Sequence, residues 1–424
     1  MIILDKESLS RYGWVIIIIV VISILLTTVP FFGETIGNRI IGAVDNLSNN
    51  IGIENTILYY DDINVALSDI DNEELGINAI SESQNAIVKI KANSNNVTII
   101  LLDDITQNEK ISINKDIKLI LNGKTIHINS GVAVDIFSGN LYIDGTTDGS
   151  SIAIESNSNL ARTFQVRGGS LTINGGSYLA HSSAVGYSSN VIMTASKVTV
   201  KNATIKATAD AGKVYAIRNM TGGNTEISNS DIIADAPYTT VDNSSYEYLS
   251  IGVNNASGAT VTLNDCYVYG THSGVQNYGD IYVDGGLFES YGHGGIYFSG
   301  NESNEAYIKN AELRDCDWKG TYNTNISSRN GSGFYIGGGP DQHNITVYMN
   351  NCYLWGEKWA GTLRGSSGET NISLYISNSR IDEGAKFRID NLTHKFYIGD
   401  GCSFAAEDTN NPDAVIITND TYVK

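Results

Sequence analysis

The chain has 424 residues, of which 27 are Lys or Arg and 46 are Asp or Glu, so its formal net charge is −19. An acidic balance of this size, without a block of basic residues, argues against nucleic acid or an anionic lipid surface as the main partner. Only 17% of the residues are charged, while Gly reaches 43, Tyr 24 and Pro 4. This composition excludes a disordered acidic tail and a helical bundle, and it predicts an all-β protein with many tight turns.

The N-terminal segment predicts one transmembrane helix. Residues 13–33 read GWVIIIIVVISILLTTVPFFG, a run without a charged residue that is long enough to cross a bilayer core. The run is longer than the apolar region of a signal peptide, and no small-residue cleavage site follows it, so we expect an uncleaved signal anchor. Lys6 and Arg11 precede the run. Their charge favours a cytoplasmic leader over residues 1–12 and a single-pass protein of the cell membrane whose C-terminal domain is extracellular.

Residues 34–55 follow as an amphipathic linker, and they allow a second interpretation of the N-terminus. A short polar leader, a long apolar helix and the stretch GETIGNRIIGAVDNLSNNI together resemble the N-termini of type IV and Flp pilins, whose helices pack into a filament. The chain departs from that pattern because Ile18 stands five places after Gly13, where those pilins carry Glu. The resemblance implies a filament subunit, and this alternative stays open.

A ten-residue block recurs through the rest of the chain. Nine copies align without gaps: LTINGGSYLA (171), VTVKNATIKA (198), TEISNSDIIA (225), VTLNDCYVYG (261), IYVDGGLFES (281), AYIKNAELRD (306), VYMNNCYLWG (347), LYISNSRIDE (374) and FYIGDGCSFA (396). Position three is always aliphatic or Met, as expected of a strand residue that points inward. Position five is always Gly, Asn or Asp, which tolerate a left-handed backbone, so the strand must bend there. Position six is always small, which suits an inward corner where successive turns stack.

A Gly-rich strand precedes most of these blocks, for example SIGVNN at 250 and GSGFYIGG at 331. Each repeat therefore contains at least two short strands separated by bends. Short strands that recur in this way are typical of a solenoid whose turns pair with one another through parallel β hydrogen bonds. We predict an all-β fold, a right-handed parallel β-helix over residues 91–424.

The first strands of this region resemble a known superfamily. The run VTIILLDDITQNEKISINKDIKLILNGKTIHI (97–128), followed by SGNLYIDGT, is similar to the first turns of bacterial surface proteins with the pectate-lyase-like β-helix, many of which are adhesin-like. The resemblance implies a fold but not an activity, because the superfamily contains lyases, hydrolases, adhesins and phage tailspikes. It also implies that residues 56–90 form a short helical cap over the first turn.

The register of the repeat predicts unpaired cysteines. Cys266 and Cys352 share one column but lie three turns apart, which is about 14 Å at ~4.8 Å per turn. A disulfide needs Cα atoms within roughly 7 Å, so this pair cannot form one. Cys316 and Cys402 fall in other columns of the alignment.

Two groups of residues are candidates for catalysis. Gly292-His293-Gly294 resembles the G-H-G motif of polygalacturonases, although the paired aspartates and the basic motif of those enzymes are missing and the glycines also fit the repeated Gly-rich strand. Lyase chemistry would need acidic residues for Ca²⁺ and a base. The acidic candidates are Asp280, Asp284, Asp315 and Asp317, and the candidate bases are Arg314 and Lys319. We expect no metal site or other cofactor, with Ca²⁺ implied only if the protein is a lyase.

Position two of the block points outward and carries Tyr in five consecutive copies. These residues are Tyr282, Tyr307, Tyr348, Tyr375 and Tyr397. Stacked aromatic residues can simply stabilise a sheet. An exposed aromatic stripe can also recognise sugar rings or a partner protein. The loops nearby carry Trp318, Trp355 and Trp359, which we include among the predicted binding residues.

We therefore predict a membrane-anchored surface protein, an adhesin or envelope scaffold, that binds a cell-surface glycan or protein. The membrane partner is contacted through residues 13–33. A polysaccharide lyase or hydrolase and a filament subunit are the alternatives, and homo-oligomerisation stays open.

Overall fold

The computed structural model describes fourteen stretches of the chain. These are residues 56–93, 96–129, 131–157, 160–183, 188–210, 212–236, 250–300, 304–315, 331–338, 344–356, 359–364, 371–381, 386–389 and 395–404. The predicted leader (1–12), transmembrane segment (13–33) and linker (34–55) lie outside them. No helix within the described stretches is long and apolar enough to span a membrane. The chain divides into two compact units, which we describe separately.

The first unit holds the described residues 56–103 and 117–120. Its elements are β1 (Thr56–Tyr60), α3 (Ile63–Asp71), β2 (Val88–Asn93), β3 (Asn96–Leu101) and β6 (Ile117–Ile120). Strands β1, β2 and β3 pair antiparallel, whereas β3 and β6 pair parallel. Parallel pairing therefore begins at β3, a few residues after the start of 91 that the sequence predicts. Helix α3 lies within the predicted cap region 56–90, and the Asp62 side chain caps it by accepting hydrogen bonds from the backbone N–H groups of Asn64 and Val65.

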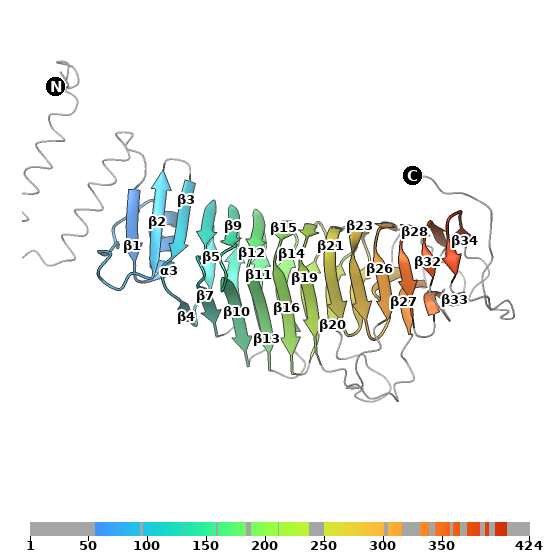
Figure 1. The fold of residues 1–424 in the computed structure, drawn as a ribbon. Helices are drawn as coiled ribbons and strands as arrows, with labels where there is room; N and C mark the ends of the chain where they lie inside the picture. The colour runs from blue at the N-terminus through green and yellow to red at the C-terminus, as the bar shows by residue number, and fades with distance from the viewer. Residues whose placement is uncertain are drawn as a thin grey trace, which may run out of the picture. The chain divides into compact units, whose positions relative to one another are not determined.

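The second unit is a parallel β solenoid with three strands in most turns (Figure 1). The strands of the first face are β9 (Asn140–Gly145), β12 (Ser170–Gly175), β15 (Lys197–Lys201), β18 (Asn224–Ser228), the first halves of β21 (Thr260–Gly270) and β23 (Asp280–Ser290), β25 (Asn304–Lys309), β28 (Asn344–Asn350), β31 (Asn371–Ser377) and β34 (Lys395–Ile398). Each pairs in parallel with the next.

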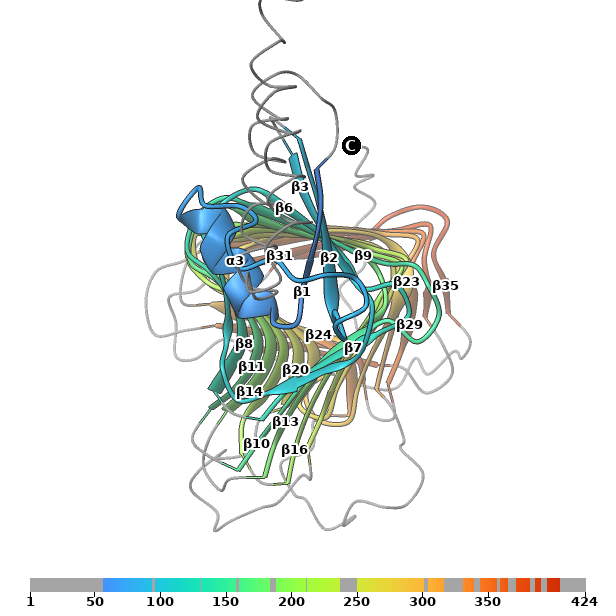
Figure 2. The same cartoon turned by 90° about the vertical axis from the view of Figure 1, so that its left-hand side faces the viewer.

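The second face follows the bend in each turn. Its strands are β4 (Ile105–Gln107), β7 (Thr125–Ile128), β10 (Ser151–Ser156), β13 (Ser177–Ser182), β16 (Thr204–Ala209), β19 (Asp231–Asp235), the second halves of β21 and β23, β26 (Glu312–Asp315), β29 (Tyr353–Trp355), β32 (Arg380–Ile381) and β35 (Ser403–Phe404). In Figure 2, which looks along the stack, β10, β13 and β16 lie behind one another.

The third face is a separate sheet. Its strands are β5 (Ile111–Ile113), β8 (Gly131–Ile136), β11 (Leu160–Val166), β14 (Ser188–Thr194), β17 (Val214–Asn219), β20 (Ser250–Asn255), β22 (Ser273–Asn277), β24 (Ile296–Gly300), β27 (Ser332–Gly338), β30 (Trp359–Arg364) and β33 (Lys386–Ile389). The Gly-rich strands that precede the repeated blocks are β20, β22, β24 and β27. Most described turns thus have one more strand than the minimum of two that the sequence indicates.

The repeated block behaves as its columns predict. Position three is buried in all nine copies, from Ile173 at 0% exposure to Ile398 at 5%. Position five has a positive φ in the first eight copies, for example +53° at Asn202 and +81° at Gly285. Because Asn, Asp and Gly tolerate this conformation better than other residues, the sequence places the bends correctly.

The ninth copy differs from the gapless alignment by one residue. There the left-handed residue is Gly401, with φ +77°, rather than Asp400. This one-residue shift places Cys402 at the inward corner, in the column of Cys352. Tyr353 and Ser403, the residues that follow the two cysteines, both pair with Arg380. Our prediction that Cys402 lies outside the column of Cys352 was therefore wrong, because a glycine takes the bend at no steric cost. Cys266, Cys352 and Cys402, the described cysteines, are free thiols.

Candidate functional site

The five tyrosines at position two form one continuous column, which we call the tyrosine column. They pair in register from Tyr282 through Tyr307, Tyr348 and Tyr375 to Tyr397. Successive ring centroids are 5.6, 5.0, 5.1 and 4.7 Å apart, and the ring planes differ by 5 to 17°. These separations are typical of offset-stacked rings, so each inner tyrosine gives part of both ring faces to its neighbours.

The column ends in an open ring at Tyr282. The residue before it in the same register is Thr262, which has no ring to cover the tyrosine. The Tyr282 side chain is accordingly 43% exposed, one of the most exposed large apolar side chains in the described structure. A flat ligand can therefore stack on this ring without displacing another tyrosine.

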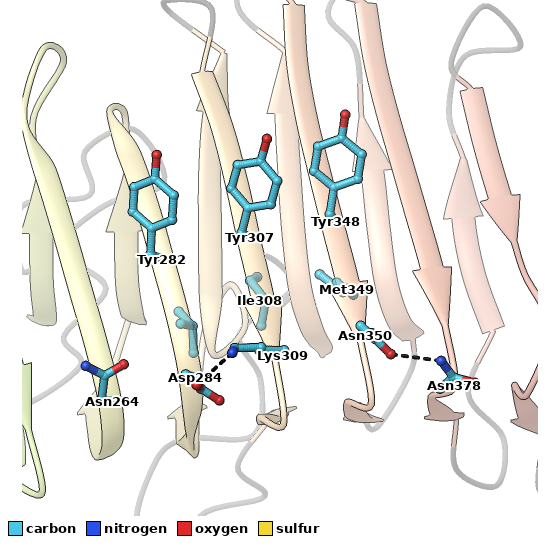
Figure 3. A pocket seen from close by; sticks show the side chains of 11 residues that line it. Asn264, Tyr282, Asp284, Tyr307, Ile308, Lys309, Tyr348, Met349, Asn350 and Asn378 are labelled. Atoms are coloured by element: carbon cyan, nitrogen blue, oxygen red, sulfur yellow. Dashed lines mark hydrogen bonds and ion pairs between the residues drawn. The ribbon is translucent and has the colours of Figure 1, made fainter. Parts of the chain in front are cut away.

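A groove of about 400 Å³ runs beside the column (Figure 3). Its other wall is position four of the repeat, with Asn264, Asp284, Lys309 and Asn350, and it is completed by Asn378 of the next turn. Asp284 and Lys309 form an ion pair of 2.9 Å, and the Asn378 amide donates to the Asn350 Oδ1 at 3.0 Å. The groove wall is therefore polar and rich in amides but carries no net charge.

The Tyr307 hydroxyl of the groove stays uncharged. In Figure 3 the hydroxyls of Tyr282, Tyr307 and Tyr348 point away from Asp284 and Asn350. The Tyr307 hydroxyl donates to the Glu305 carboxylate at 2.6 Å. This hydrogen bond, more than burial, raises the pKa of Tyr307 to about 12. An aromatic wall that includes this uncharged hydroxyl therefore faces a polar wall without net charge.

The predicted tryptophans do not join this groove. Trp355 lies on β29 of the second face, in register with Arg314. Trp359 begins β30 of the third face, opposite Ser332. Trp318 lies outside the described residues. The bends of each turn separate these side chains from the tyrosine column, so the structure brings together the tyrosines alone.

His293 lies in a second, more buried cluster of aromatic and imidazole rings. Its ring stacks on that of His272, with centroids 4.4 Å apart, and it packs against Tyr297 in a tilted arrangement and against Tyr335 in a T-shaped one. His272 is only 5% exposed. Burial, and next the neighbouring His293, hold the pKa of His272 well below its usual value, so this imidazole is neutral. His272 was not predicted from the sequence, although its spacing of 21 residues from His293 is about one turn of the solenoid.

Arg314 and Asp315 do not converge on one site. They are neighbours on β26, whose side chains alternate between the two sides of the strand. Asp315 is fully buried, whereas Arg314 forms ion pairs with Glu289 at 2.7 Å and Glu312 at 3.2 Å. Asp317 lies outside the described residues. These ion pairs hold the Arg314 guanidinium on the opposite side of β26 from the Asp315 carboxylate, so the two do not form a base and a ligand of one site.

The described residues contain no group of three or more His, Cys, Asp or Glu side chains that could hold a metal ion. A Ca²⁺ site of the lyase type would need several carboxylates together. The Asp284 carboxylate instead accepts from Lys309 and Asn310, and these contacts lower its pKa.

The polar wall of the groove was not predicted from the sequence. The signal was present, because position four of the block alternates with the buried position three and must also point outward.

Comparisons with known proteins add no assignment, since no family model, curated protein or solved structure matches the chain.

Proposed function

We propose that this chain is a membrane-anchored cell-surface protein, built as a right-handed parallel β-helix, that binds a neutral glycan in the groove beside the tyrosine column. The observation that carries the proposal is the pairing of an aromatic wall with an uncharged, amide-rich wall along the same groove. Binding sites for small polar ligands combine apolar surface with a few placed polar groups. Sugars present both an apolar ring face and hydroxyl groups, so they match this combination.

The open ring of Tyr282 is the first anchor in this proposal. A sugar ring packs its apolar face on the free tyrosine face, which loses no existing stacking contact. The amides of Asn264 and Asn350 can both donate and accept, so they suit sugar hydroxyls. Further sugar units would follow the groove past Tyr307 and Tyr348.

In this proposal the membrane anchor is the apolar run of residues 13–33. It would hold the solenoid at the cell surface with the tyrosine column outside the cell. An adhesin or an envelope scaffold fits this arrangement. A protein ligand is the alternative occupant of an exposed aromatic surface.

The test uses the full-length protein in detergent micelles and a panel of neutral and acidic polysaccharides, with and without Ca²⁺. Bound polysaccharide and newly formed chain ends are both measured. We expect retention of a neutral polysaccharide without cleavage, and at least tenfold weaker binding for Tyr282→Ala and for Tyr348→Ala. The matched control is Tyr353→Ala, which removes a tyrosine from β29 on the second face.

Several outcomes contradict the proposal. Binding that Tyr353→Ala weakens as much as Tyr282→Ala does would show that the groove is not the site. New chain ends that disappear in His293→Ala would make the protein a hydrolase or lyase. Fibres that form from the full chain but not from a chain lacking residues 1–33 would favour the filament subunit.

A further inference from the structure

The outer side of the third face gathers the arginines of the N-terminal half of the solenoid. Between residues 40 and 313 the sequence has three arginines, Arg162, Arg167 and Arg218. The first two lie on or just after β11, and Arg218 lies on β17, two turns away. Lys110, just before β5, joins them. We call these four cations and Asp135 the arginine cluster.

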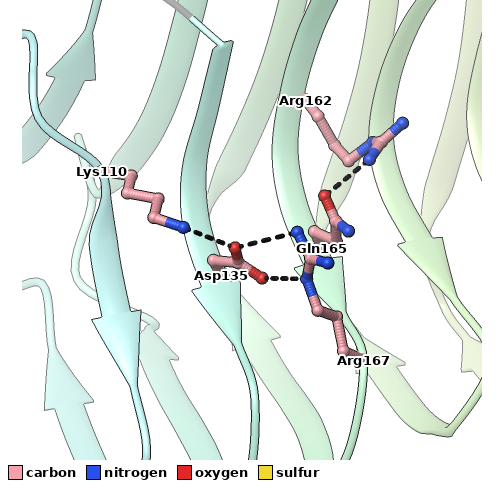
Figure 4. Close-up of polar contacts among 5 residues, drawn as sticks. All are labelled: Lys110, Asp135, Arg162, Gln165 and Arg167. Carbon is pink, nitrogen blue, oxygen red and sulfur yellow. Dashed lines mark hydrogen bonds and ion pairs between the residues drawn. The ribbon is translucent and has the colours of Figure 1, made fainter.

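One carboxylate serves only part of this cluster (Figure 4). Asp135 is 1% exposed and lies 2.8 Å from the Lys110 ammonium and 2.9 Å from the Arg167 Nε. Both cations also lie over the ring of Phe137. Asp135 is therefore fully used by two cations at one end of the cluster.

Arg162 and Arg218 have no carboxylate partner among the described residues. Arg162 donates from Nη1 to the Gln165 side-chain oxygen at 2.6 Å, and Arg218 lies over the ring of Tyr215 at 5.3 Å. The Nε atoms of both arginines are buried without a hydrogen-bond partner. Burial first, and then the charges of Arg218 and Arg167, lower the pKa of Arg162 to about 10, although Asp135 opposes this shift. Two like charges thus lie near each other, partly removed from water.

A buried amide beside these arginines also lacks partners. Asn190 is 0% exposed, and neither its Nδ2 nor its Oδ1 makes a hydrogen bond. It occupies the same register position as Arg162 in the turn before and Tyr215 in the turn after. Residues at one register position project from the same side of a sheet, so the amide belongs to the cluster. Buried polar groups are nearly always paired, which makes this amide a sign of a missing ligand group.

We propose that the arginine cluster is a binding site for the oxyanion of an acidic saccharide, a carboxylate or sulfate held between Arg162 and Arg218. Guanidinium groups bind such oxyanions through paired N–H donors. The anion also removes the repulsion between the two arginines. The amides of Asn190 and Gln165 then meet the sugar hydroxyls, since an amide donates and accepts.

This site is separate from the tyrosine groove in position and in charge. The groove lies on the first face and is neutral, whereas the cluster lies on the third face and has three more positive than negative groups. A chain of net charge −19 repels acidic polymers in general, so a local cationic site gives selectivity for where such a ligand binds. The two proposals can therefore fail independently.

The test measures binding of glucuronate, glucose, acetate and sulfate to the full-length protein in detergent micelles by calorimetry and by the shift in melting temperature. We expect saturable binding of glucuronate that weakens with added NaCl, whereas any binding of glucose should be insensitive to NaCl and to the arginine substitutions. Arg162→Gln and Arg218→Gln should each weaken it at least tenfold, and Asn190→Ala by a smaller factor. Lys206→Gln, an exposed lysine on β16 of the second face, removes the same charge elsewhere and should change little, as should Tyr282→Ala.

Folding of each variant is checked by circular dichroism, and Arg162→Lys provides a variant that keeps the charge but not the paired donors. Glucuronate binding that is equal in wild type, Arg162→Gln and Arg218→Gln would overturn the proposal. Acetate binding as tight as glucuronate binding would show a simple anion site without saccharide recognition. Absence of any saturable binding by glucuronate and sulfate would also refute it.

Discussion

Asn202 supports a bend that each turn of the solenoid requires, and replacing it with Val should be costly. Asn202 has φ +53°, and its side chain donates to the Asn174 Oδ1 at 3.2 Å. A left-handed backbone costs roughly 1–2 kcal/mol for a residue with an ordinary Cβ, and a β-branched residue lies at the upper end. Loss of the exposed hydrogen bond adds about 0.5–1 kcal/mol. We therefore expect Asn202→Val to lower the free energy of unfolding by about 2–3 kcal/mol.

Two matched variants separate the backbone effect from the side-chain effect. Asn202→Gly loses the hydrogen bond but adopts the bend freely, so it should cost about 1 kcal/mol, part of it through the entropy of the unfolded chain. Lys201→Val changes the exposed neighbour on β15, where β-branched residues are favoured, and should be nearly neutral. Thermal and urea unfolding of the full-length protein measure all three. Equal stability of Asn202→Val and Lys201→Val would refute the assignment of the bend.

Three further perturbations follow from buried groups. Ala311 lies at position six of the block, the inward corner, and is 2% exposed. Ala311→Leu overfills this corner and should lower the free energy of unfolding by about 1–3 kcal/mol, whereas Ala311→Ser should lower it less. A wild-type melting temperature for Ala311→Leu would contradict the register. Asp135→Asn leaves Lys110 and Arg167 without their shared carboxylate and should lower the free energy of unfolding, measured in urea, by about 1–3 kcal/mol. The loss is smaller than for a fully buried pair because both cations are about half exposed. An unchanged free energy would show that the pairs are not formed. The pKa of His272 is lower in the folded than in the unfolded state, so the unfolded state binds the proton first as the pH falls below about 6.5. The free energy of unfolding should therefore drop by up to about 1.4 kcal/mol per pH unit. His272→Gln should lose this slope, and an unchanged slope would mean that another group causes it.

The repeat makes much of this fold predictable from sequence. A left-handed residue tolerates few side chains, and a stacked corner tolerates only small ones, so positions five and six of the block mark every turn. Alternation then assigns position three to the core and position two to the surface, and the tyrosine column follows directly. The prediction erred only where two allowed residues stood side by side, at Asp400 and Gly401, and the glycine took the bend.

The candidate sites were less predictable, because they depend on which residues the turns bring together. Arg162 and Arg218 are distant in sequence, and nothing in the local pattern shows that both project from one side of the third face. His272 and His293 stack only because the turn between them has almost the length of their separation. Arg314 and Asp315 are adjacent in sequence but lie on opposite sides of β26, so their proximity in the chain is misleading.

By itself, the sequence determined the parallel solenoid, its bends and the outward tyrosines, because each depends on local backbone preference and on a period of two along a strand. Only the tertiary structure decided the third strand of each turn, the amide wall beside the tyrosines and the gathering of the arginines on one face. These features depend on the length of every loop between strands. The loop lengths together set which residues of neighbouring turns come into register, and no local sequence pattern contains that information.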